Sequence, residues 1–372
     1  MNTFVSAYIQ KVVSNLGSYH TDNYDAHRFG PESKYIPLGF HFARQILCAL
    51  SKLGFIREST ARRNLIAAFD PIAPYLQNLQ TLFENLSGEK SRQTLIEVVA
   101  YRTLGYRKIK LAVNNPAHWE NLRLAETLVL GDEEISTGFM HFKLAKMDLN
   151  KIGYPIQFYF IPAGVVIDFI EQQYRCETEN GAIECESGDY VIDAGGCWGD
   201  TALYFAHNSG SSGKVYSFEF LEDNLRIFHK NLSLNESLAK NIQVIQNPVW
   251  SKSGEDVAIA ANGPGTHISH DGASDKNLLK FKTVSIDDLV NSGSIEKADF
   301  IKMDIEGAEL SALKGAEQTI RRFKPKLAIT VYHNLKDFWE IPEWLDSLGL
   351  GYKFYLRHFT IHSEETVLFA KI

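Results

Sequence analysis

The sequence predicts an α/β protein with a mostly parallel sheet, preceded by a mainly helical segment. Two observations support this class. After about residue 150, short apolar runs alternate with segments of helical periodicity. The apolar runs are nearly continuous, which is typical of parallel strands buried on both faces by helices.

Helical spacing dominates the chain before residue 150. In "SRQTLIEVVAYRTLGY", for example, Leu95, Val98 and Val99 recur at the helical period. We expect a mainly helical N-terminal domain over residues 1–150. It serves either for packing and oligomerisation or as a cap over a substrate, and the sequence leaves both roles open.

A β-hairpin lead-in is expected over residues 151–188. Within it, Asn180-Gly181 is a strong signal for a type I′ turn, and counting outward from this turn places Cys176 opposite Cys185. Two reduced thiols are the simpler expectation, because 4 cysteines are too few for a disulfide scaffold.

The strand–helix alternation continues to the end of the chain and defines a domain over residues 189–372. The strands are expected at 189–194, "KVYSFEF", "IQVIQ", "ADFIKMDI" and "PKLAITVY", with "DVAIAA" and "KFKTVSI" as a smaller pair and "YKFYLRHF" and "TVLFAKI" as a final antiparallel pair. The helices are expected at about 198–207, 222–234, 307–322 and 341–348.

Composition excludes several classes of protein. The formal net charge is −7 and no long Lys/Arg run is present, so a nucleic-acid partner is not expected. No apolar run approaches the ~20 residues of a membrane span, so stable membrane insertion is not expected. Lys11 interrupts the region where a signal peptide needs its apolar core, which favours a cytoplasmic protein.

The first strand of the second domain runs into "VIDAGGCWGD", residues 191–200. Ligands of open α/β sheets bind at the carboxyl ends of the strands, where these glycines lie. A dinucleotide fingerprint would need glycines where the chain has Cys197 and Asp200. Acids before and after the glycines suit a positively charged ligand better than two phosphates, and S-adenosylmethionine is such a ligand. A purely structural turn is the alternative.

A second acid fits the same interpretation. Glu219 ends the second strand roughly 25 residues after Asp193, close to the ~20-residue spacing at which an acid accepts ribose hydroxyls in nucleoside-binding sheets. Phe220 beside it is suited to pack on adenine. The alternative is a solvated acid at the start of a helix.

The stretch "FIKMDIEGAEL" carries three charges near the end of one strand. Lys302, Asp304 and Glu306 alternate, so they share one face. Charges on one face of a core strand are costly unless they serve a site at its exit, although an ion pair that only shapes the turn is the alternative.

His333 leaves the next strand at the same edge of the sheet and is the candidate general base. A second source of a base is "NGPGTHISHDGASD", whose His267 and His270 lie in a loop-like sequence. Asp304, Glu306 and His267 have metal-ligating side chains, but their spacing alone does not justify a metal, and none is predicted.

Together, "VIDAGGCWGDTALYFA", "VYSFEF", "TVSIDDL" and "ADFIKMDIEGAELSALKGAEQTI" resemble the FkbM-type methyltransferases over roughly residues 185–372. The resemblance implies the class I S-adenosylmethionine-dependent fold, a Rossmann-like sheet with an antiparallel C-terminal strand. It also implies O-methylation, often of sugars or natural products. The family's turn usually reads Gly-Ala-Asn or similar, whereas this chain has Gly195-Gly196-Cys197.

The resemblance also implies roles for individual residues. The cofactor residues are Asp193, Gly195 and Gly199 at the methionine end, Glu219 at the ribose, Phe220 at the adenine, Asn247 near the adenine, and Asp304. The catalytic roles are a hypothesis drawn from the residues themselves: His333 is the base, and Asp304 and Glu306 orient acceptor or cofactor.

The sequence therefore predicts an S-adenosylmethionine-dependent methyltransferase that acts on a hydroxyl of a small-molecule or glycan acceptor. Oligomeric state is open, and a homodimer is compatible with the sequence. One alternative is a non-catalytic nucleoside-binding or interaction module on the same fold. Another is an NAD-dependent oxidoreductase, which the broken glycine fingerprint disfavours.

Overall fold

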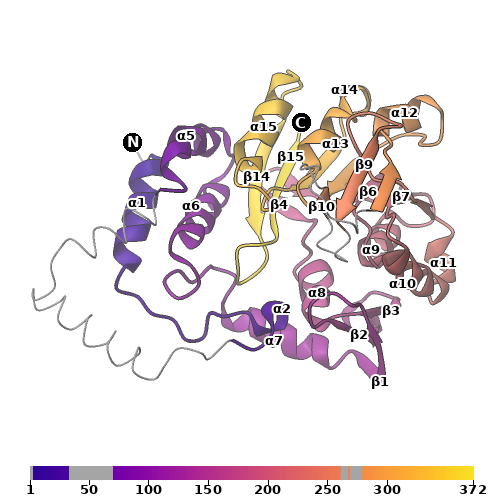
Figure 1. Ribbon diagram of the computed structural model, residues 1–372, viewed down its shortest axis with the longest axis horizontal. Coiled ribbons are helices and arrows are strands. Elements are labelled where there is room, and N and C mark those ends of the chain that lie inside the picture. Colours follow the sequence, from indigo (N-terminus) through magenta and orange to yellow (C-terminus); the bar gives the residue numbers. More distant parts are fainter. Residues whose placement is uncertain (1–2, 33–69, 261–266, 269–278) are drawn as a thin grey trace, which may run out of the picture.

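The computed structural model describes residues 3–32, 70–260, 267–268 and 279–372 of the chain (Figure 1). Its centre is a sheet of seven strands in the order β14-β15-β13-β12-β6-β7-β8. The strands are β6 (Tyr190–Ala194), β7 (Lys214–Phe218), β8 (Ile242–Ile245), β12 (Phe300–Met303), β13 (Lys326–Thr330), β14 (Lys353–His358) and β15 (Thr366–Lys371).

The directions of the strands confirm the predicted fold class. Strands β8, β7, β6, β12 and β13 pair in parallel, whereas β15 is antiparallel to both of its neighbours, β13 and β14. In chain order the seven strands are therefore arranged 6-7-5-4-1-2-3, with the last strand reversed. This is the sheet of a class I methyltransferase, with β6 as its first strand and the switch in strand order between β6 and β12.

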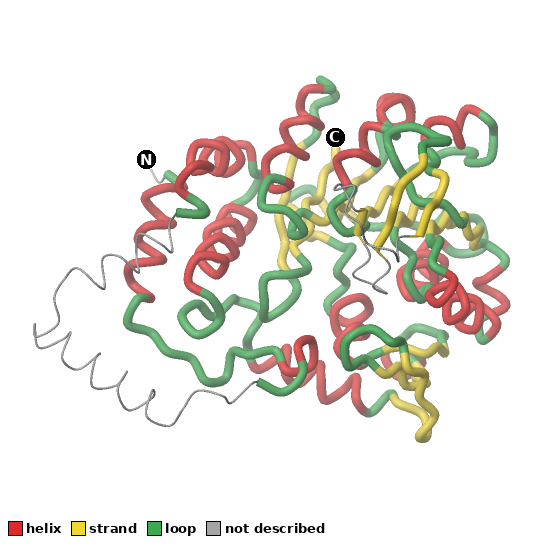
Figure 2. Tube along the Cα trace, in the orientation of Figure 1, coloured by secondary structure: helices red, strands yellow, loops and turns green. Residues whose placement is uncertain are grey.

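Helices cover both faces of this sheet. They are α9 (Asp200–Ser209), α10 (Glu222–Ser233), α11 (Glu236–Ala239), α12 (Ile286–Asn291), α13 (Glu309–Lys314), α14 (Glu317–Phe323) and α15 (Asp337–Ser347). Successive residues of a strand point to opposite faces, so Val191 of β6 packs in one core with α9 and α10, and Ile192 packs in the other with α12 to α15. Figure 2 shows the strands between the two sets of helices.

The N-terminal helices extend one of these layers. They are α1 (Phe4–Asn15), α2 (Ala26–Phe29), the 3₁₀ turn η1 (Ala73–Tyr75), α5 (Leu76–Asn85), α6 (Glu89–Leu104) and α7 (Pro116–Glu126). Helix α6 contacts β14, and the Ser87 amide donates to the Phe354 carbonyl at 2.7 Å (Figure 1). Leu79 and Leu95 share a core with Ile192. The predicted helices are present, but they pack on the sheet and not around a core of their own.

The expectation of helices up to residue 150 is wrong for its last part. β1 (Val129–Ser136), β2 (Lys143–Asp148) and β3 (Gln157–Phe160) form an antiparallel sheet that crosses the expected boundary. β1 has five consecutive exposed residues and contains three acids, so its sequence lacks the alternation that marks a half-buried strand. Short helical turns around β3 complete this region: η2 (Asn150–Ile152), α8 (Pro162–Val165) and the π-helical η3 (Val166–Ile170).

The predicted register of the cysteine hairpin is also wrong. β4 (Cys176–Thr178) pairs with β5 (Gly181–Ile183) so that Cys176 lies opposite Ile183, not Cys185. The turn is centred one residue earlier than expected, because Gly181 pairs with Thr178 as the first residue of β5. Both thiols are free, in agreement with the expectation of reduced cysteines.

Two other elements differ from prediction. The helix expected at 307–322 is divided into α13 and α14 at Gly315, where a Cβ would lie 2.1 Å from the Trp250 carbonyl oxygen, so the chain is pressed against a neighbouring segment. The small strand pair has a third member: β9 (Asp256–Ala260) lies between β10 (His267–Ile268) and β11 (Leu279–Lys282). Over the described ranges, no helix is both long and apolar enough to cross a bilayer.

Candidate active site

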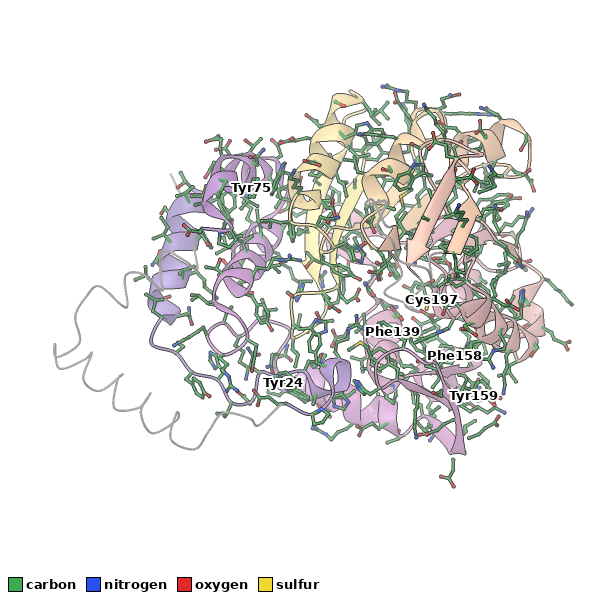
Figure 3. All side chains as sticks on the ribbon, viewed as in Figure 1. Tyr24, Tyr75, Phe139, Phe158, Tyr159 and Cys197 are labelled. Carbon is green, nitrogen blue, oxygen red and sulfur yellow. The ribbon has the colours of Figure 1, made fainter. Side chains whose placement is uncertain are left out.

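A cavity of about 190 Å³ lies at the carboxyl ends of β6 and β12, where the fold class places its ligand. Figure 3 shows Cys197, one of its lining residues, between the large sheet above and the small sheet that carries Phe158 and Tyr159 below. The polar lining comes from segments far apart in the chain: Asp25, His27, Arg28, Asp168, Gln173, Tyr174, Asp200, Thr201, Lys302, Asp304, Glu306, Tyr332, Thr360, His362 and Glu365.

The glycine turn after β6 forms one wall of this cavity. The amides of Gly195 and Gly196 both donate to the Phe218 carbonyl, at 3.2 and 2.9 Å, which joins the ends of β6 and β7. Gly195 has φ +92°, and a Cβ there would lie 2.0 Å from the Asp304 carbonyl oxygen. The glycine is required because the exit of β12 presses directly on the turn.

Asp193 lies beneath the turn and does not line the cavity. It is fully buried, pairs with Lys302 at 3.1 Å, and accepts hydrogen bonds from the hydroxyls of Thr201 and Ser217. Lys302 in turn donates to the Gly195 carbonyl at 2.6 Å. The ion pair therefore fixes the shape of the turn, so Asp193 and Lys302 influence a ligand at the turn indirectly, through the position of its backbone.

Two polar atoms at this turn have no hydrogen-bond partner among the described residues. Trp198 is 3% exposed and its indole Nε1 is unpaired, and Asp200 is 7% exposed with its Oδ1 unpaired. Both residues line the cavity. Buried polar atoms are nearly always satisfied, so an unpaired donor and an unpaired acceptor on one wall indicate a ligand that supplies both partners.

Carboxylates dominate the charge of the cavity. Burial raises the pKa of Asp200 to about 7, and burial together with Asp304 and Glu364 raises the pKa of Glu365 to about 8. The pKa of Asp168 is also raised, by burial and by the like charge of Asp200. A cationic ligand would relieve this repulsion.

Asp304 is the centre of a hydrogen-bond network on the opposite wall. Its Oδ1 accepts from the hydroxyls of Thr330 at 3.2 Å and Tyr332 at 3.3 Å, and its Oδ2 accepts from Tyr174 at 3.4 Å. The Tyr332 hydroxyl also lies 3.3 Å from Oε1 of Glu365. The two carboxylates are thus connected through one phenol.

His333 stands among three carboxylates and is not in the cavity lining. Its Nε2 lies 3.5 Å from Asp304 and 3.4 Å from Glu306, and its Nδ1 lies 3.1 Å from Glu309. Burial alone would lower the pKa of His333, but the three carboxylates outweigh burial and hold this pKa well above its usual value. These carboxylates favour the protonated imidazole, and the role of His333 as general base stays a prediction.

The other predicted cofactor residues lie outside the lining of this cavity. Glu219 is 7% exposed, and its carboxylate accepts from the amides of Phe220 and Leu221 at 2.6 and 2.7 Å. Phe220 packs edge-on against Phe281, and the Asn247 side chain donates to the Lys282 carbonyl at 3.0 Å.

Gly199, with φ +85°, packs on Phe228 at the start of α9. His267 belongs to β10, while His270 lies outside the described residues. The structure thus brings together Gly195, Asp304 and Glu306 from the predicted set at one cavity.

Sequence reasoning missed the cavity residues that come from other segments. Asp168 lies in the π-helical turn η3. Glu365 precedes β15 and has φ +62°, a backbone conformation that is unfavourable for residues other than glycine. No local motif marks either residue. Trp198 and Asp200 stand on either side of Gly199 in the glycine-rich stretch, and this position was the signal that could have identified them.

Comparisons with known proteins identify the domain that forms most of the large sheet. The model of the methyltransferase FkbM domain matches residues 185–354. Hexuronic acid methyltransferase AglP of Haloferax volcanii is 32% identical over 144 residues, which are 37% of this chain and 54% of that protein. The chain thus spans about half the length of this curated relative.

Among solved structures, methyltransferase FkbM from Methylobacillus flagellatus has a TM-score of 0.49 at 21% identity, covering 81% of this chain and 60% of that one. Fibrillarin from Aeropyrum pernix, solved with natively bound S-adenosyl-L-methionine, has a TM-score of 0.33 at 14% identity, covering 50% of this chain and 67% of that one. The match to the domain model and the strand order together show a methyltransferase FkbM domain over residues 185–354 of this chain.

Proposed function

We propose that the protein is an S-adenosylmethionine-dependent methyltransferase that methylates a sugar hydroxyl. The observation that carries the proposal is the pair of unpaired polar atoms at the glycine turn, Trp198 Nε1 and Asp200 Oδ1. An N–H donor beside a carboxylate is complementary to the carboxylate and ammonium of an amino acid, and S-adenosylmethionine has such a head group.

The charge of the cavity fits the same ligand. Asp168 and Asp200 are buried and Glu365 is partly buried, and the pKa of each carboxyl is raised, so a positive charge would favour its ionised form. S-adenosylmethionine supplies an activated methyl group on a positively charged sulfur. A ligand with phosphates would meet the lining acids and few free cations, because Lys302 is paired with Asp193 and Arg28 with Glu364.

Glu365 is the residue that we propose to take the proton from the acceptor hydroxyl. As the acceptor oxygen bonds to the methyl carbon and the carbon–sulfur bond breaks, that proton passes to the Glu365 carboxylate. Its pKa of about 8 is close to the working pH, as an efficient base requires. Gln173 donates to Glu365 Oε2 at 2.6 Å and holds the side chain in place. In this proposal Asp304 and Glu306 hold the acceptor, which is one of the two roles that the sequence left open for them, the other being to orient the cofactor.

The nature of the lining supports a sugar as acceptor. Phe142, Phe160 and Tyr332 offer apolar faces, and Asp304 and Glu306 offer acceptors for hydroxyl groups. The relative from Haloferax is named for a hexuronic acid. An acidic sugar would bring one more carboxylate into a cavity that is already acidic, so we propose a neutral sugar for this chain.

The test is methyl transfer from S-adenosylmethionine labelled in the methyl group to neutral hexosides and to hexuronosides, with Glu365→Gln and the neighbouring Glu364→Gln as a matched pair. Glu364 pairs with Arg28 and does not line the cavity. We expect Glu365→Gln to lower kcat by about a hundredfold while S-adenosylhomocysteine affinity stays within threefold, because loss of a general base costs ~10²–10⁴ in rate. Glu364→Gln should retain most of the activity at pH 8 and shift the pH–rate profile to lower pH, because Glu364 helps to raise the pKa of Glu365.

Three outcomes would overturn parts of this proposal. Equal loss of kcat in both variants would remove Glu365 as the base. Transfer to hexuronosides alone would contradict the neutral acceptor. Absence of S-adenosylhomocysteine binding by the folded protein would remove the methyltransferase assignment altogether.

A further inference from the structure

A cluster of three acidic groups at the wall of the cavity has little positive charge to balance it. Glu309 is fully buried, and Asp304 and Glu306 have side chains 18% and 30% exposed. In the described part of the chain, no Lys or Arg forms an ion pair with any of the three. Their ion-pair partner there is His333, which is itself 8% exposed.

The contacts within this cluster are ionic but poorly aligned. The ring nitrogens of His333 lie 3.1 to 3.5 Å from the carboxylates, yet neither nitrogen has a well-formed hydrogen bond in the described structure. Glu309 Oε2 is likewise buried and unpaired. Buried charges are normally either hydrogen-bonded or bound to a metal ion. The ring nitrogens of His333 and Oε2 of Glu309 are not fully hydrogen-bonded.

The positions of the side-chain atoms are compatible with a bound metal ion. One donor atom from each of Asp304, Glu309 and His333 lies within 4.8 Å of the other two, which is close enough for all three to contact a single ion. The residues come from three elements: the end of β12, the first turn of α13 and the end of β13.

Hydrogen bonds hold two of these carboxylates in place. Thr330 Oγ1 lies 3.2 Å from Asp304 Oδ1 and 3.3 Å from Glu309 Oε1, and so fixes the two carboxylates relative to each other. The amide of Ile305 donates to Glu309 Oε1 at 2.8 Å. A side-chain set that is already positioned before an ion binds is what a protein metal site requires.

We propose that Asp304, Glu309 and His333 bind a divalent metal ion of the Mn²⁺ class at the wall of the cavity, with Glu306 as a neighbouring carboxylate. Two carboxylates and one imidazole form an oxygen-rich set with a single nitrogen, which suits Mn²⁺ better than a thiolate-preferring ion. The ion takes the place of the imidazole proton. Because Asp304 lines the cavity and Glu309 does not, one side of the ion faces the cavity and is open to a hydroxyl oxygen of an acceptor.

The test is direct binding of Mn²⁺ to the full chain without S-adenosylmethionine, which keeps it independent of the methyltransferase assignment. The free ion is measured by electron paramagnetic resonance during titration with MnCl₂, after treatment of the protein with EDTA. The variants are Glu309→Gln and His333→Gln. Asp337→Asn is the matched control, because Asp337 is a buried acid close to the cluster that contributes no donor atom to it.

We expect one Mn²⁺ per chain, at least a tenfold loss of affinity in Glu309→Gln and His333→Gln, and a change within threefold in Asp337→Asn. Competition with Mg²⁺ and Zn²⁺ then ranks the ions. If Glu309→Gln does not fold, as judged by circular dichroism, His333→Gln decides the question.

Two results would overturn the proposal. One is no loss of free Mn²⁺ at millimolar concentration with folded wild-type protein, which would leave His333 as the counter-ion of the cluster. The other is Mn²⁺ binding that survives both substitutions but is lost in Asp200→Asn, which would place the ion among the acids of the cavity instead.

Discussion

At the scale of single residues, the site is defined by atoms that the protein leaves unsatisfied. Most polar groups around the glycine turn are paired: Asp193 with Lys302, and Asn231 with the Trp198 carbonyl at 2.9 Å. The exceptions, Trp198 Nε1 and Asp200 Oδ1, both line the cavity. An unpaired buried group costs ~1–3 kcal/mol, so the folded chain carries a cost at this wall that a ligand can remove.

Replacement of Trp198 by Phe removes the unpaired N–H and retains a ring beside Phe160. We expect S-adenosylhomocysteine affinity to fall about tenfold, because a hydrogen bond to a charged group is worth ~1.5–3 kcal/mol. Isothermal titration calorimetry gives the affinity. 5′-Methylthioadenosine, which lacks the amino-acid head, is the control ligand. Equal losses for both ligands would show that the ring, and not the N–H, makes the contact.

The raised pKa of Asp200 predicts a pH dependence of binding. Burial raises this pKa from 3.8 to about 7, with Asp168, Asp193 and Lys302 as its charged neighbours. Between about pH 4 and 7 the folded protein therefore holds a proton that the unfolded chain releases, so the contribution of this group to stability falls as pH rises through that window. A cationic head group favours the ionised form, so binding should release protons and tighten as pH rises.

We expect S-adenosylmethionine affinity to rise several-fold from pH 5.5 to 7.5, below the pKa of ~7.7–8.0 of the ligand's own amino group. Calorimetry in buffers of different ionisation enthalpy measures the released protons. Proton uptake over this range would contradict the assigned role of Asp200.

At the scale of elements, the turn after β6 and the end of β12 form one unit. Gly195 presses on the backbone of Asp304, and Lys302 donates to the Gly195 carbonyl, so two walls of the cavity are positioned together. The sequence predicted these two elements well, because each motif is local. It failed for the hairpin of Cys176 and for β1, where pairing depends on tertiary contacts that no short pattern encodes.

Gly195→Ala tests this unit. The new Cβ would lie 2.0 Å from the Asp304 carbonyl oxygen at φ +92°. Gly181→Ala is the control, because Gly181 has φ +94° but open space around it, so it isolates the ~1–2 kcal/mol cost of the left-handed conformation. We expect Gly195→Ala to lower the free energy of unfolding by ~4 kcal/mol or more, as severe core clashes do. Equal effects in urea denaturation would show that the contact is not tight.

At the scale of the whole molecule, the N-terminal helices and the sheet share a core. Leu79, Leu95 and Phe354 belong to one buried cluster, and Arg102 donates to the Tyr332 carbonyl at 2.5 Å beside the cavity. The N-terminal region also supplies Asp25 and Arg28 to the cavity lining. The sequence predicted helices here, but their position could not be read from it, because long-range packing leaves no periodic signal. The positions of Asp168 and Glu365 could not be read from the sequence either, because these residues reach the site from segments far apart in the chain.

A shortened chain of residues 113–372 tests the shared core. It lacks α1, α5 and α6, and so exposes the apolar side of β14 around Phe354 and Leu356. We expect it to be aggregation-prone and to lack a cooperative thermal transition, as judged by circular dichroism. A soluble fragment that unfolds cooperatively, with a Tm within about 5 °C of that of the full chain, would show that the helices are a separate unit. A shift of that size corresponds to a change of about 1 kcal/mol in the free energy of unfolding.

The central claim is that the glycine turn and Asp200 bind the amino-acid head of S-adenosylmethionine. The most direct measurement is calorimetric titration of S-adenosylhomocysteine at pH 7.5 into the wild-type protein, Asp200→Asn and the control Asp223→Asn, whose side chain is exposed in the first turn of α10. We expect micromolar binding, a loss of at least tenfold in Asp200→Asn (the cost of one charge-assisted contact), and an unchanged affinity in Asp223→Asn. Absence of binding by the folded wild-type protein, or equal binding by Asp200→Asn, would contradict the claim.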